Sequence, residues 1–95
     1  MAATNYINGT CLDGFTTRET EKAILFRFES DEYCEKFEQW IPKSVVTMLF
    51  ESGNLQIIKL PAWFVRKNAN VNACAYKQET AKRIIAEFEK KEKGL

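Results

Sequence analysis

The chain contains no histidine, so it lacks the side chain that most often acts as a general base or binds a metal near neutral pH. Its three cysteines, Cys11, Cys34 and Cys74, are widely spaced and form no C-x-x-C pair. A zinc site would therefore need a carboxylate as its fourth ligand. Gly-rich phosphate loops and nucleophile motifs are also missing. We expect a protein that is not an enzyme and that holds neither a metal nor a cofactor.

Long apolar runs are missing as well. No stretch approaches the roughly 20 apolar residues that a membrane-spanning helix needs. The first residues lack the basic region and the apolar centre of a signal peptide. An odd number of unpaired cysteines is typical of a reducing compartment. The sequence thus predicts a cytoplasmic protein without a membrane partner.

Ninety-five residues are enough for one domain, which we expect to span 1–95. Within it we expect a loose lead-in over 1–9, a β-rich core over 10–68 and a helix over 77–93. The helix prediction rests on an apolar stripe at i, i+3, i+4 and i+7, formed by Ala81, Ile84, Ile85 and Phe88. This stripe should pack on the sheet, or it could instead meet a partner or a second copy of the chain.

The stretch over 40–63 holds both tryptophans, both prolines and the densest run of β-branched residues. Apolar runs over 45–50 and 55–60 predict two strands, and the Ser-Gly-Asn turn at 52–54 predicts a hairpin between them. Pro42 should make a corner between strands. Pro61 should end the second strand and begin a short helix over 62–67.

Three further strands are expected before this stretch. Residues 22–29 are largely apolar on both faces, which indicates a central strand. Residues 10–17 give a weaker signal, typical of a bulged or edge strand. Residues 33–41 alternate as a strand with solvent contact around Trp40, although 31–40 also fits a helix. Residues 68–72 should form a polar connector, and 73–76 either a last strand or the start of a helix.

These elements predict the α+β class. About five antiparallel strands should curl into a small open β-barrel, with the short helix from Pro61 and the C-terminal helix packed alongside.

An aromatic-basic set is the first candidate site. Its tryptophans could stack bases while its cations neutralise phosphates, as in small-barrel proteins that bind single-stranded DNA or RNA. Alternatively both tryptophans belong to the core, in which case Trp40→Ala should cost about 3–5 kcal/mol. The set comprises Trp40, Lys43, Lys59, Trp63, Arg66 and Lys67.

Two other sets could contact a partner. Residues 1–42 carry eight acidic and four basic side chains, whereas residues 43–95 carry five acidic and ten basic side chains. The acidic set could mimic phosphates toward a basic protein, or it could be a solvated outer face. The apolar members of the terminal helix could form a helix interface, including one in a homodimer. The acidic set is Glu29, Asp31, Glu32, Glu35 and Glu38, and the helix set is Ile84, Ile85 and Phe88.

Three motifs in order carry a resemblance: E-T-E-K-A-I-L at 19–25, W-I-P-K-S at 40–44 and L-P-A-W at 60–63. Together they resemble a group of small phage- and prophage-type proteins over roughly residues 18–68. The resemblance implies a compact, mostly β domain in a mobile-element setting, and it supplies no catalytic residues.

On this basis we expect a non-catalytic binding protein that blocks a host protein or nucleoprotein complex in the host cytoplasm, as anti-CRISPR-like inhibitors do. The alternative is an accessory protein that binds single-stranded nucleic acid.

Overall fold

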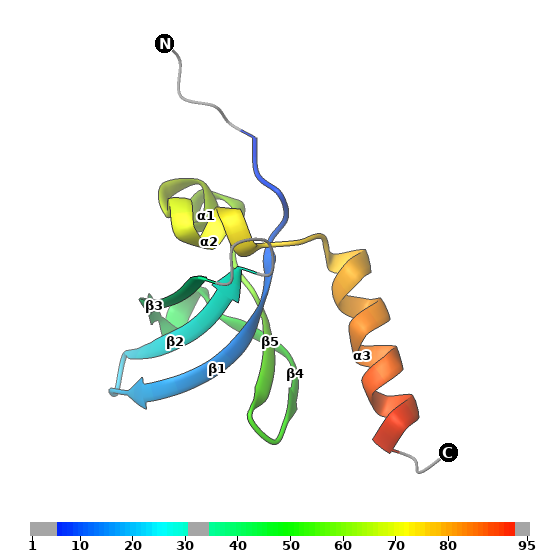
Figure 1. The fold of residues 1–95 in the computed structure, drawn as a ribbon. Coiled ribbons are helices and arrows are strands. Elements are labelled where there is room, and N and C mark those ends of the chain that lie inside the picture. Colours follow the sequence, from blue (N-terminus) through cyan, green and yellow to red (C-terminus); the bar gives the residue numbers. More distant parts are fainter. Residues whose placement is uncertain (1–5, 31–34, 93–95) are drawn as a thin grey trace.

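The computed structural model describes residues 6–30 and 35–92, which form one antiparallel sheet and three helices (Figure 1). A single 3-10 turn, η1 (Lys43–Val45), follows the third strand. The strands are β1 (Cys11–Glu19), β2 (Ala23–Ser30), β3 (Glu35–Pro42), β4 (Thr47–Ser52) and β5 (Leu55–Lys59). The helices are α1 (Ala62–Lys67), α2 (Ala69–Cys74) and α3 (Gln78–Glu92).

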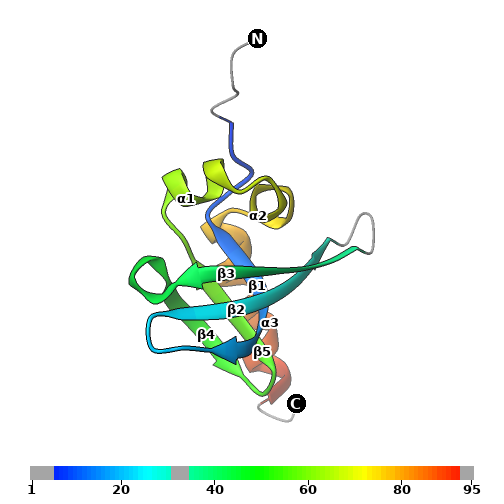
Figure 2. The same ribbon diagram turned by 90° about the vertical axis from the view of Figure 1, so that its left-hand side faces the viewer.

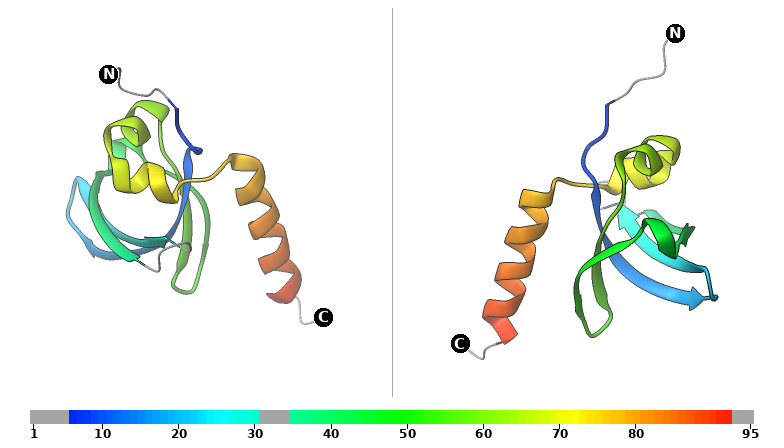
Figure 3. Two further views of the ribbon diagram at one scale, coloured as in Figure 1. Left: turned by 45° about the horizontal axis from the view of Figure 1, so that its top comes forward. Right: turned by 180° about the vertical axis from the view of Figure 1, so that it is seen from behind.

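The sheet has the strand order β3-β2-β1-β5-β4, with every neighbouring pair antiparallel. Its curvature is visible in Figure 3. Among the described strands β3 and β4 are edges and do not pair with each other, so the sheet is not closed. The expected α+β class with five antiparallel strands is confirmed, whereas the barrel is not.

β1 lies in the middle of the sheet, so its interpretation as an edge strand is wrong. Its first half pairs with β5 and its second half with β2, and the register shifts between Thr16 and Arg18. The expected bulge is therefore present. Gly14 lies where the pairing changes: a Cβ added there would be 2.0 Å from the carbonyl oxygen of Arg27. Only glycine allows the two backbones to come this close.

The main core lies on the inner face of the sheet, where side chains from β1, β2, β3 and β5 meet. α1 and α2 cover one end of this face (Figure 1) and add their own buried residues to it. Leu12, Phe26, Ile41, Ile58, Leu60, Val65 and Val71 are almost completely buried in this cluster.

A second, smaller cluster lies between β5 and α3 on the opposite face. Cys11, Ile57 and Ala81 are fully buried there, and Ile84 and Ile85 pack against them. The ring of Phe88 meets that of Phe50 edge-on, with 5.4 Å between centroids. The predicted terminal helix is confirmed over the described residues, and its apolar stripe faces the sheet.

Several local predictions are confirmed because their signals are short-range. The hairpin turns at Gly53, whose φ of 58° suits glycine, and α1 begins directly after Pro61. Residues 35–42 form a strand, so the helical alternative is wrong there. Val45, predicted as strand, belongs to η1, because Val46 N–H donates to the Lys43 carbonyl at 3.2 Å and closes a turn after Pro42.

The polar connector predicted over 68–72 is instead largely α2, which also takes in Cys74. Long-range contacts stabilise this asparagine-rich helix. Asn8 N–H donates to Asn72 Oδ1 at 2.9 Å, and Asn8 Nδ2 donates to the Asn72 carbonyl at 2.7 Å. These bonds, with one from Asn72 Nδ2 to the Tyr6 carbonyl at 3.2 Å, hold the end of the expected loose lead-in. Tyr76 makes a single antiparallel bridge with Cys11 rather than a strand.

Candidate functional site

Two rows of side chains stand on the face of β1, β2 and β3 that points away from the core. Directly opposed residues of an antiparallel sheet lie on the same face, so the register defines the rows. We call this set the outer face. Its first row is Phe15, Arg27 and Glu38, and its second row is Arg18, Leu25 and Trp40.

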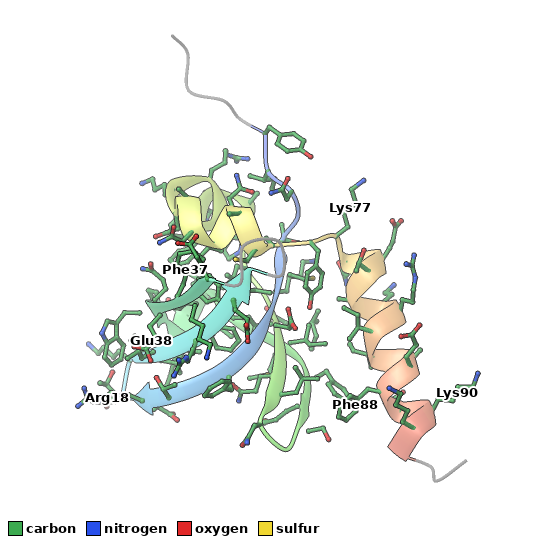
Figure 4. The ribbon with its side chains drawn as sticks, viewed as in Figure 1. Arg18, Phe37, Glu38, Lys77, Phe88 and Lys90 are labelled. Carbon is green, nitrogen blue, oxygen red and sulfur yellow. The ribbon has the colours of Figure 1, made fainter. Side chains whose placement is uncertain are left out.

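The outer face carries large apolar side chains that remain in water. Phe15 is 39% exposed and Trp40 is 44% exposed, although both stand on well-paired strands. α3 lies beside β4 and β5 and leaves β2 and β3 uncovered (Figures 1 and 2). Arg18 and Glu38 accordingly lie on the side of the molecule away from Phe88 and Lys90 of α3 (Figure 4). Exposed aromatic residues on a rigid sheet are typical of an interaction surface.

Trp40 is therefore not a core residue, and the interpretation that placed both tryptophans in the core is wrong. Phe37 and Ile41 of β3 turn inward, so Trp40 between them must point outward. Trp63 is 51% exposed on α1.

A groove of about 550 Å³ adjoins the outer face. It opens where β1 leaves β2 to pair with β5, and it runs toward the β4–β5 turn. Phe15 and Arg27 belong both to the groove and to the outer face. The groove is lined by Asp13, Gly14, Phe15, Arg27, Phe28, Glu29, Lys36, Asn54 and Leu55.

The charges on this side of the sheet alternate in sign. Glu29 stands opposite Lys36, and Glu38 stands opposite Arg27. Glu38 also accepts a hydrogen bond from Thr17 Oγ1 at 3.3 Å. The acidic set is thus interrupted by basic side chains. Its members Asp31 and Glu32 lie outside the described residues.

The aromatic-basic set is dispersed. Lys43 pairs with Glu19, and Lys59 Nζ donates to Gln78 Oε1 of α3 at 3.1 Å. On α1, Lys67 Nζ lies 5.9 Å from the centre of the Trp63 ring, and Arg66 is exposed nearby. No ring contact joins Trp63 to Trp40 in the described part of the chain. The set is thus distributed over four elements, β3, η1, β5 and α1, and both Lys43 and Lys59 already have partners.

The helix set is turned toward the sheet. Ile84 and Ile85 pack on the second cluster, and Phe88 packs on Phe50. These contacts use the stripe that was expected to pack on the sheet or to meet a partner.

Reactive groups are few over residues 6–30 and 35–92. No three Cys, Asp or Glu side chains of these residues gather where they could hold a metal ion. Cys11 is fully buried, and this burial raises the pKa of its thiol. A thiol in such surroundings is a poor nucleophile. None of the described helices combines the length and apolar character needed to cross a membrane.

Four residues of the outer face were missed by sequence reasoning: Phe15, Arg18, Leu25 and Arg27. Residues 22–29, which include Leu25 and Arg27, were interpreted as a central strand that is largely apolar on both faces. The charge of Arg27 was a signal that one face meets solvent. The position of Phe15 beside Arg27 depends on strand pairing that the sequence does not show.

Comparison with known proteins gives no match to this chain among family models, curated proteins or solved structures.

Proposed function

We propose that the chain is a non-catalytic binding protein that occupies the surface of another protein through the outer face. The observation that carries this proposal is the pair of exposed rings, Phe15 and Trp40, held among arginines on paired strands. Aromatic residues and arginine are enriched at protein interfaces and supply most of the binding energy there. Because strand pairing already fixes the backbone and an aromatic side chain has only two χ angles, binding costs little conformational entropy.

The alternating charges favour a protein partner over a nucleic acid. A groove that follows a phosphate backbone presents mainly positive charge. Here Glu29 and Glu38 stand directly opposite Lys36 and Arg27. A protein surface carries both signs of charge and can match such a pattern, which also gives specificity.

The proposal extends to the biological setting. The resemblance of three motifs to small phage- and prophage-type proteins supports a mobile-element origin, with action in the host cytoplasm. In that setting the protein would block a host protein or nucleoprotein complex by covering its working surface. The proposal also includes an open-barrel form of the sheet, which is supported by the way β1 passes from β5 to β2.

A photo-crosslinking experiment tests the binding face. Phe15 is replaced by p-benzoylphenylalanine, which keeps its aromatic ring, and the same residue is placed at Trp63 as a matched exposed position on α1. Crosslinking in host cells from position 15, and not from position 63, to one defined protein supports the proposal. Crosslinking from position 63 alone would contradict it.

Binding of single-stranded nucleic acid is the second candidate, and the exposed Trp63 beside Lys67 and Arg66 favours it. Fluorescence anisotropy with labelled oligonucleotides at about 50 and 200 mM salt separates the candidates, since phosphate contacts weaken steeply over this range. Salt-sensitive binding that is lost in Trp63→Ala would favour nucleic acid. Absence of binding at low salt would exclude this candidate.

A further inference from the structure

β3 is an edge strand, and the register shows which of its backbone groups are unpaired. Lys43 N–H donates to the carbonyl of Lys22, the residue directly before β2, at 2.8 Å. In an antiparallel ladder the residues alternate between bonding to the neighbour and pointing away from it. Counting back from Lys43, the backbone groups of Lys36, Glu38 and Trp40 therefore point to the open edge.

The two edges of the sheet differ in their protection. β4 has a register shift between Met48 and Phe50, and such bulges discourage pairing with another strand. β3 pairs with β2 over eight consecutive residues without a shift. Within the described part of β3, one edge group has a side-chain partner: the Trp40 carbonyl accepts from Gln39 Nε2 at 3.3 Å.

We infer that β3 pairs with β3 of a second copy of this chain, antiparallel, about a two-fold axis at Phe37. In this register Lys36 of each copy stands opposite Glu38 of the other, and both side chains stand on the same side of the sheet as the outer face. Charged residues at an edge usually oppose pairing with unrelated strands. Here the alternating signs make the strand complementary to itself, and each opposed pair of unlike charges favours the match.

Shifting the register by two residues would place Glu38 opposite Glu38, which is unfavourable. Charge therefore selects the register centred on Phe37. The two Phe37 side chains would face each other at the axis as a non-hydrogen-bonded pair, the closer kind. Phe37 is half-buried, and its ring lies 5.6 Å from Phe28, so it can extend the core across the axis.

The result would be one continuous sheet through both copies, with their outer faces side by side. This pairing needs no other partner, so its test is independent of the test of the proposed function.

Sedimentation velocity over a range of concentrations tests the inference with four proteins: wild type, Lys36→Glu, Glu38→Lys and the double swap. Wild type should form a dimer as concentration rises. Each single charge reversal places two like-charged pairs at the interface. It should therefore raise the dissociation constant of the dimer at least about ten-fold. The double swap restores unlike pairs and should return the dimer constant to within about three-fold of wild type. Glu89→Lys on α3 is the matched control and should change nothing.

Circular dichroism melts at a concentration where all variants are monomeric separate weakened pairing from weakened folding. This check matters because Lys36 and Glu38 also stand opposite Glu29 and Arg27. A monomeric wild type at millimolar concentration, or folded single variants that dimerise like wild type, would overturn the inference.

Amide exchange gives a readout that does not depend on substitutions. The N–H groups of Lys36 and Glu38 should exchange more slowly at high than at low protein concentration, while those of β4 stay unchanged. Concentration-dependent protection on β4 or α3 instead would place the contact elsewhere and overturn the inference.

Discussion

At the scale of single residues, Gly14 and Gly53 are glycines for different reasons: Gly14 for lack of space and Gly53 for its backbone conformation. A Cβ at Gly14 would meet the Arg27 carbonyl oxygen at 2.0 Å, a backbone atom that cannot move aside. Gly53 has a φ of 58° but open space around it. We predict that Gly14→Ala destabilises the protein by about 3 kcal/mol or more, through overpacking. Gly53→Ala should cost only about 1–2 kcal/mol, through backbone strain. Urea unfolding of both variants measures these losses of stability, and equal losses would contradict the close approach of β1 and β2 at Gly14.

The buried thiol of Cys11 predicts a pH dependence. Burial raises its pKa above the ordinary value of 9.0, so the folded state holds the proton after the unfolded state has lost it. Its contribution to stability is full below pH 9 and is lost as pH rises through the higher, folded-state pKa. Between about pH 8 and pH 10 the free energy of unfolding should therefore fall less in Cys11→Ala than in wild type. Ile57→Val, in the same cluster, keeps the thiol and should show the wild-type fall.

At the scale of elements, α3 is held by a small set of contacts on one face of the sheet. Phe88 meets Phe50 edge-on with an interplanar angle of 70°. Phe88→Ala should lower the free energy of unfolding by about 1–2 kcal/mol. This loss is smaller than the roughly 3–5 kcal/mol expected for a fully buried phenylalanine such as Phe26. A double-mutant cycle with Phe50→Ala should give a coupling of about 0.5–1.5 kcal/mol.

Trp63 lies on α1 and serves as the control. In a double-mutant cycle between Phe88 and Trp63, the two losses of stability should add within about 0.5 kcal/mol. Additivity between Phe88 and Phe50 would mean that α3 is not docked on β4 in the way described.

Local signals made several elements predictable. The hairpin at Gly53, the helix after Pro61 and the stripe of α3 each depend on neighbouring residues alone. α2 was missed because the bonds between Asn8 and Asn72 join segments 64 residues apart. The central place of β1 was missed because its two halves pair with different strands.

At the scale of the whole molecule, the site was only partly predictable. Alternation along β3 indicated that Trp40 meets solvent, and the structure agrees. That Phe15 and Arg27 share its face follows from the strand register, which no sequence pattern shows. The members of the aromatic-basic set lie on β3, η1, β5 and α1, and how these four elements are placed relative to one another depends on tertiary packing that no sequence pattern shows.

The exposure of Trp40 changes what its removal should do to the folded state. With 44% of its surface in water, Trp40→Ala should cost about 1–2 kcal/mol and leave the domain folded. A core tryptophan would cost about 3–5 kcal/mol. Thermal unfolding followed by circular dichroism decides between the two, and loss of the folded state would contradict the surface position.

The affinity of the protein for its crosslinked partner, measured by calorimetry for wild type, Trp40→Ala and Trp63→Ala, is the most direct test of the outer face. Both tryptophans are about half exposed, so they differ mainly in location. We predict that Trp40→Ala weakens binding at least about 30-fold, as for an interface hot spot, while Trp63→Ala stays within about two-fold. Unchanged affinity for Trp40→Ala with loss for Trp63→Ala would contradict the account and move the binding surface to α1.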